Sequence, residues 1–284
     1  MLANAARSSA VHPAWLIFAG LAWVCNVTAA EIPAPSGQAG PSLGAHTLLA
    51  QADGRGSSPA VTQPITTRAN GSSLLVLNGG YASNTSAPAD SYANHWVQHG
   101  DNAVYHGYQG RFDVKAYVAL SARGGPRHTV SLRKNGNASG EITVPFIEIR
   151  DADVLQDFAE NYAVPGLTAR IAGKLTRGVR RLLSEPPVNS VTLTSGEVTT
   201  TGPATLIAVW WGDAVVYRMT AVPDHGFTVI DRFLDLPPES GVQCAVAARR
   251  VDRAGTYKVD WTGSPAQGAI LWLFAFERSN RPGR

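Results

Sequence analysis

Two apolar runs of the same pattern, far apart in the chain, constrain its fold most strongly. LLVLNGG (Leu74–Gly80) matches LIAVWWG (Leu206–Gly212) with an offset of 132 residues. Two further matches follow in the same order: ALSAR over AVAAR with an offset of 126 (119–123 and 245–249), and Gly140, Ile142 and Phe146 over Gly268, Ile270 and Phe274 with an offset of 128. Offsets that drift slightly while the order is kept are typical of a duplicated unit with loop insertions. The sequence therefore predicts two related units, at 65–150 and 187–284.

The sequence of each unit is typical of β-structure. Short runs rich in β-formers, such as SLLVL, KAYVAL, HTVSL and EITVPFIEI, are separated by turn clusters such as RGGP and NGNASG. A chain with 44% hydrophobic and 16% charged residues can build a globular core. We therefore expect an all-β protein with two related antiparallel β-sandwich or jelly-roll-like units, joined by a short helical hairpin. This order of strand patterns resembles poorly characterised β-sandwich modules of exported bacterial and phage-associated proteins, a resemblance that implies no residue roles.

The helical hairpin is predicted at 151–186. Val154, Leu155, Phe158 and Tyr162 recur with a helical period after an acidic start. A second amphipathic pattern runs from Leu167 to Leu183. It contains five basic residues and no acidic one, Arg170, Lys174, Arg177, Arg180 and Arg181. Such a face suits contact with an anionic membrane or polysaccharide surface, although a helix docked by its leucines would look the same.

The amino-terminal part indicates export. Residues 1–30 combine Arg7, an apolar stretch of about ten residues and small residues before Glu31, as in a signal peptide. No later segment is a membrane-span candidate. We expect 31–64 to be a disordered tether, because it is rich in Ala, Gly, Pro and Ser. The mature chain would be secreted, periplasmic or extracellular, and would keep one cysteine, Cys244, in an apolar run typical of an inert buried thiol.

The adjacent tryptophans Trp210 and Trp211 are one candidate binding feature. On a strand they point to opposite faces, so one ring can fill the core while the other contacts a ligand. Exposed aromatic rings stack on sugar rings, and Asp213 and Tyr217 could orient such a ligand. The alternative is that both rings are structural, since tryptophan is on average highly buried.

A polar stretch in the first unit is a second candidate. It interleaves imidazoles and aromatic rings at His95, Trp96, His99, Tyr105, His106 and Tyr108. On a strand, His95 and His99 would lie about 13 Å apart, too far to share a metal ion. We therefore predict a ligand-binding loop or an ordinary surface. Calcium could bind Asp90, Asp101 or Asp113, but no motif supports it.

These observations leave three functions open. The first is a non-catalytic binding or structural module for carbohydrate or cell-surface glycan. The second is a polysaccharide hydrolase or lyase that draws its acid or base from Asp213, Asp224, His225 or Asp231, with Asp235 also available. The third is a structural subunit of a surface assembly that self-associates through strand edges. A formal net charge of +3 does not favour a nucleic-acid partner.

Overall fold

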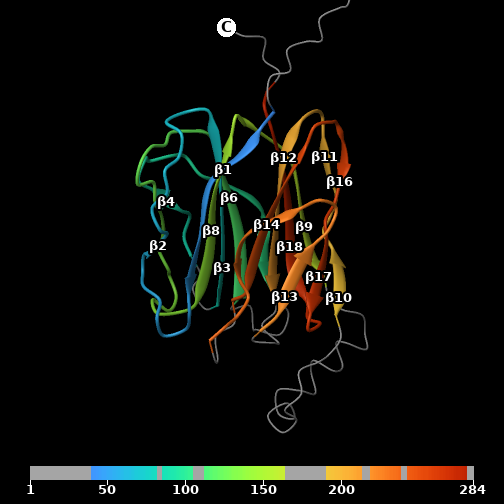
Figure 1. Cartoon of the computed structure of the whole chain (residues 1–284). Coiled ribbons are helices and arrows are strands. Elements are labelled where there is room, and N and C mark those ends of the chain that lie inside the picture. Colours follow the sequence, from blue (N-terminus) through green and yellow to red (C-terminus); the bar gives the residue numbers. More distant parts are fainter. Residues whose placement is uncertain are drawn as a thin grey trace, which may run out of the picture. The chain divides into compact units, whose positions relative to one another are not determined.

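The chain folds into antiparallel β-sheets (Figure 1). This computed structural model describes residues 40–81, 85–104, 112–163, 190–212, 218–237 and 242–279. The first half contributes β1 (Ser42–Gln51), β2 (Ala60–Val61), β3 (Ser72–Tyr81), β4 (Ala89–Asp90), β5 (Val97–Val104), β6 (Phe112–Ala122), β7 (Val130–Leu132) and β8 (Ile142–Arg150). The second half contributes β9 (Val154–Ala163), β10 (Val191–Thr194), β11 (Val198–Thr200), β12 (Ala204–Gly212), β13 (Thr220–Pro223), β14 (Thr228–Phe233), β15 (Cys244–Val251), β16 (Gly255–Tyr257), β17 (Asp260–Ser264) and β18 (Ala269–Glu277). The predicted all-β class is confirmed for these residues.

The two halves build five-stranded sheets with the same order of strands. One sheet runs β1-β8-β3-β6-β5 and the other β9-β18-β12-β15-β14. The three matched sequence runs fall on β3 and β12, on β6 and β15, and on β8 and β18. The repeat identified in the sequence thus corresponds to a repeated strand order.

The register corrects two of the sequence matches. Val76 pairs with Phe146, whereas Ala208, its counterpart in the second half, pairs with Leu273 rather than Phe274. The match of Phe146 to Phe274 is therefore wrong by one residue, which reverses the face of the sheet. The ALSAR match is also displaced, because Leu74 pairs with Ala119 but Leu206 pairs with Arg249.

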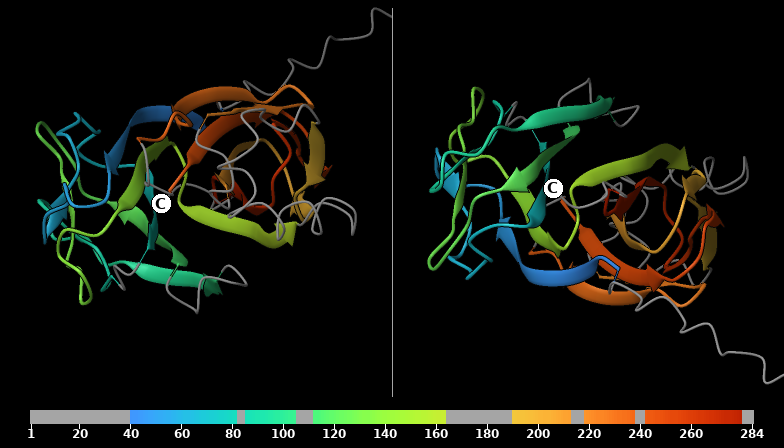
Figure 2. Two further views of the ribbon diagram at one scale, coloured as in Figure 1. Left: turned by 90° about the horizontal axis from the view of Figure 1, so that it is seen from below. Right: turned by 90° about the horizontal axis from the view of Figure 1, so that it is seen from above.

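The large sheets pack face to face, and smaller sheets cover their outer sides (Figure 2). The central core contains Leu75 and Leu77 of β3 and Ile207 and Val209 of β12. The sheet β2-β7-β4 encloses a second core in the first half, and the sheets β10-β17-β13 and β11-β16 enclose a third in the second half. Strands β12 and β18 are buried at every position, which explains why their sequences are continuously apolar.

The first predicted helix is a strand. Residues 154–163 form β9, which pairs with β18 along its whole length. A β-bulge places Leu155 opposite Phe276 and Asp157 opposite Ala275. The extra residue lets Leu155, Phe158 and Tyr162 all pack on the central core, at spacings of three and four that imitate a helix. The second predicted helix, with its five basic residues, lies outside the described residues.

The predicted tether is wrong for the part that the structure describes. Residues 42–51 form β1, which pairs with β8, and β2 also lies before residue 65. A bulge in β1 at Gly44 lets its backbone pass close to the carboxylate of Glu148, with which a Cβ at Gly44 would collide. Gly44, one of the small residues that suggested disorder, is therefore needed for this close approach. Residues 1–39, with the predicted signal peptide, lie outside the described residues.

The two ends of the described fold come together. Glu277 pairs with Ala204, and a Cβ built on Gly40 would lie 2.7 Å from the Cβ of the adjacent Pro203.

Across the same described ranges, no helix has the length and apolar character to cross a membrane.

Candidate functional site

Both tryptophans of the central pair are structural. Trp210 is 1% exposed and packs in the core of the second half, whereas Trp211 is fully buried in the core between the large sheets. The alternation of faces was predicted correctly, but neither ring can stack on a ligand, so their predicted role in binding is wrong. Asp213 and Tyr217, their proposed companions, lie outside the described residues.

His95, Trp96 and His99 do not form one site. His95 is exposed in the loop before β5, while the ring of His99 packs edge-on against Phe158 at 5.5 Å. Burial lowers the pKa of His99. Trp96 is half-buried and packs on the first-half core. Tyr105, His106 and Tyr108, together with the side chains of Asp101 and Asp113, lie outside the part of the chain that the structure describes.

Asp90, considered above as a calcium ligand, is saturated by protein donors. Its carboxylate accepts hydrogen bonds from the Tyr92 and Asn94 backbone N–H groups, the Asn94 amide, the Trp96 indole N–H and His128. Burial raises the pKa of Asp90, but these hydrogen bonds, led by that from His128, outweigh it and hold the pKa below its usual value. Asp90 is therefore unsuited to bind calcium.

This network has the order of groups found in a catalytic triad, yet it is closed. The Thr67 hydroxyl accepts a hydrogen bond from the Gly125 N–H and lies 2.8 Å from His128 Nδ1, while His128 Nε2 lies 3.2 Å from Asp90. A neutral imidazole that donates its Nε2 proton to the Asp90 carboxylate accepts at Nδ1 from the Thr67 hydroxyl. Thr67 is 5% exposed and His128 is fully buried. A substrate cannot reach the Thr67 hydroxyl. The network instead connects loops to the sheet β2-β7-β4. Sequence reasoning did not single out Thr67 or His128, which are distant in the chain from Asp90.

The carboxylates predicted in the second unit separate into different environments. Asp231 on β14 is hydrogen-bonded to His46 of β1 at 2.8 Å, and so links the two large sheets. Asp235 lies at the rim of a groove. Asp224 and His225 are close together and are joined by Asp260, which the sequence gave no reason to associate with them.

These three residues form an exposed cluster on the second outer sheet. His225 Nε2 lies 3.1 Å from Asp224 Oδ2 and 3.2 Å from Asp260 Oδ2. The Asp260 N–H donates to Asp224 Oδ1 at 2.9 Å, and the Asp224 N–H donates to the Asp260 carbonyl at 3.0 Å. The Thr194 side chain lowers the pKa of Asp260, burial opposes this, and His225 and Lys258 lower it further. The cluster is an imidazole held between two carboxylates.

A tight turn places His225 in this position. The Phe227 N–H donates to the Asp224 carbonyl, and both central residues have positive φ, 51° at His225 and 78° at Gly226. Such values define a turn of type I′, whose preferred central pair is Asn-Gly. Histidine is therefore an uncommon choice at this position.

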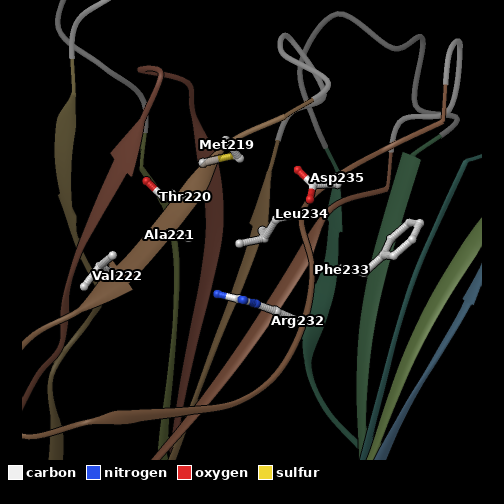
Figure 3. A pocket seen from close by; sticks show the side chains of 8 residues that line it. All are labelled: Met219, Thr220, Ala221, Val222, Arg232, Phe233, Leu234 and Asp235. Atoms are coloured by element: carbon white, nitrogen blue, oxygen red, sulfur yellow. The ribbon is translucent and has the colours of Figure 1, made fainter.

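The strands on either side of the turn diverge and leave a groove (Figure 3). Strand β13 is the edge of the outer sheet and β14 is the edge of the large sheet. Met219, Ala221 and Leu234 are buried at its base, whereas Val222 and Arg232 are exposed on the two strands. Its volume is about 490 Å³. The groove thus combines an apolar base with polar side chains at its rim.

Comparisons with models of protein families, with curated proteins and with solved structures find no match.

Proposed function

We propose that the protein is an exported, non-catalytic binding or structural module, with carbohydrate or cell-surface glycan as its preferred ligand. The amino-terminal sequence supports export. The observation that carries the proposal is the open groove between β13 and β14, which combines an apolar base with exposed polar side chains, among them Arg232 and Asp235. Guanidinium and carboxylate groups hydrogen-bond sugar hydroxyls, and an apolar groove base suits the C–H face of a sugar ring.

A panel of soluble and insoluble polysaccharides tests this proposal when binding and product release are recorded together. Binding without products is expected. Arg232→Gln, at the groove, should weaken binding, whereas Arg55→Gln, an exposed arginine in a loop of the first half, should leave it unchanged. Absence of binding by a folded sample, or equal effects of the two variants, would refute the glycan assignment.

The enzyme alternative is less well supported by the geometry. A glycosidase needs room for the scissile bond between its carboxyl groups. Here His225 Nε2 occupies the space between Asp224 and Asp260, and Asp231 is engaged by His46. New reducing ends or unsaturated products in the same panel would favour the enzyme.

Strand edges favour the assembly alternative as a second candidate. Val222 is 57% exposed on β13, an edge strand, and exposed apolar edges are sites of pairing between chains. Sedimentation over a range of concentrations, without sugar, would reveal such oligomers. Val222→Lys should abolish them if β13 forms the contact.

A further inference from the structure

We propose that Asp224, His225 and Asp260 form a binding site for a divalent transition-metal ion, best matched by Zn²⁺. This site goes beyond the proposed glycan function and does not depend on it. The chemistry of the donors argues against calcium, because imidazole is a ligand for zinc and its neighbours in the periodic table, whereas calcium takes oxygen ligands.

Two of the three separations between the donor atoms suit such an ion, and all three lie within 4.8 Å. Zinc binds imidazole nitrogen and carboxylate oxygen at about 2.0 to 2.2 Å, so neighbouring ligand atoms lie roughly 3 to 3.5 Å apart. The two contacts of His225 Nε2, at 3.1 and 3.2 Å, fall in this range. The ion would replace the Nε2 proton that these carboxylates now share, and two carboxylates would balance its charge.

The protein also holds Asp224 in place through its other carboxylate oxygen. Asp224 Oδ1 is fixed by the Asp260 N–H, which leaves Asp224 Oδ2 directed at the imidazole. Outer hydrogen bonds of this kind orient metal ligands. All three side chains are partly exposed, so water can complete the coordination.

Comparison with the first half separates this cluster from a structural network. Asp90 ends β4, and Asp224 directly follows β13, which occupies the matching edge of the second outer sheet. The Asp90 side chain is fully buried and surrounded by donors. Asp224 Oδ2 instead faces the His225 imidazole, which a metal can bind, and the Asp224 side chain is 45% exposed. The same place in the two halves thus carries a closed network in one and an accessible donor set in the other.

The decisive variant is His225→Asn. It removes the imidazole but creates Asn-Gly, the preferred pair for this turn, so the fold should be retained or stabilised. Asp260→Asn tests the ligand that β17 contributes. His95→Asn is the matched control, because His95 is exposed and lies outside the cluster.

The experiment is calorimetric titration of the untagged full chain with ZnCl₂, and separately with CaCl₂, without sugar. We expect one zinc ion per chain with micromolar affinity, no calcium binding in that range, and normal affinity in His95→Asn. Affinity should fall by about 100-fold in His225→Asn and by about tenfold or more in Asp260→Asn. Circular dichroism and thermal melting should show both variants folded. Absence of zinc binding below millimolar concentration, or unchanged affinity in folded His225→Asn, would overturn the proposal. Failure of glycan binding would leave this result unaffected.

Discussion

The indole of Trp211 lies directly over Gly79, at equivalent positions of the two central strands. A Cβ on Gly79 would approach ring atoms Cε3 and Cζ3 of Trp211 to 2.6 Å. Gly79 and Trp211 are the sixth residues of the matched runs LLVLNGG and LIAVWWG. The large side chain of one half therefore fills the space left by the missing side chain of the other.

Gly79→Ala should destabilise the protein by about 1 to 3 kcal/mol, because the added methyl group overpacks the central core. Urea unfolding would measure the change. Gly202→Ala is the control, since a Cβ there meets no atom of the described residues within 4 Å and should change stability by about 0.5 kcal/mol or less. Equal stability of Gly79→Ala and the wild type would contradict the packing described here.

Trp210→Ala and Trp211→Ala should each lower the free energy of unfolding by about 3 to 5 kcal/mol, because each substitution leaves a cavity in a different core. Chemical denaturation would show the loss in both variants. A stable, folded Trp211→Ala protein that selectively lost ligand binding would restore the contact role that burial argues against.

Asn78→Leu should stabilise the protein by about 1 to 2 kcal/mol. The Asn78 side chain is fully buried, and neither its Oδ1 nor its Nδ2 has a hydrogen-bond partner among the described residues. The matching residue of the second half is Trp210, so the fold accepts an apolar group at this place. A rise in the melting temperature would confirm the prediction, whereas a fall would reveal a polar role for Asn78.

Stability should depend on pH through His46. Its hydrogen bond to Asp231 raises the pKa of the imidazole, burial opposes this, and the charge of Asp231 adds to the rise. The contribution of this hydrogen bond to stability is therefore fully present below pH 6.5, the pKa of His46 in the unfolded chain. It is lost as pH rises through the pKa of His46 in the folded protein. We expect the stability gap between wild type and His46→Gln to be about 1 kcal/mol or less and to shrink as the solution becomes alkaline. A stability gap that widens at alkaline pH would contradict the prediction that folding raises the pKa of His46.

Glu148→Gln should lower the free energy of unfolding by about 3 kcal/mol at neutral pH. The carboxylate accepts hydrogen bonds from the Ala45 and Arg68 N–H groups, the Ser72 hydroxyl and Arg150. Burial raises the pKa of Glu148, but these donors outweigh it, so its contribution is present above the unfolded pKa and lost on acidification. Acid titration of unfolding should show a shallower dependence in the variant. Glu197→Gln, at an exposed residue, is the control.

Much of the fold could be predicted from the sequence, because strands buried on both faces leave continuous apolar runs such as those of β3 and β12. The errors arose where an irregularity changed the period. The bulge in β9 gave Leu155, Phe158 and Tyr162 a helical spacing, and the bulge in β1 requires Gly44, in a segment whose composition resembles a flexible tether.

The candidate site was less predictable. Asp224 and His225 were singled out as adjacent polar residues, but Asp260 joins them only through the pairing of β13 with β17. Likewise, the sequence placed Trp210 and Trp211 on opposite faces, but could not show that a second sheet covers each face. Both depend on contacts between distant segments.

The meeting of Gly40 and Glu277 beside Pro203 and Ala204 has a consequence for engineering. Since the region from Gly40 to Glu277 begins and ends at one place, a short peptide can join these two residues without stretching the outer strands. The region is therefore suited to circular permutation, and to insertion as a cassette into a surface loop of a host protein.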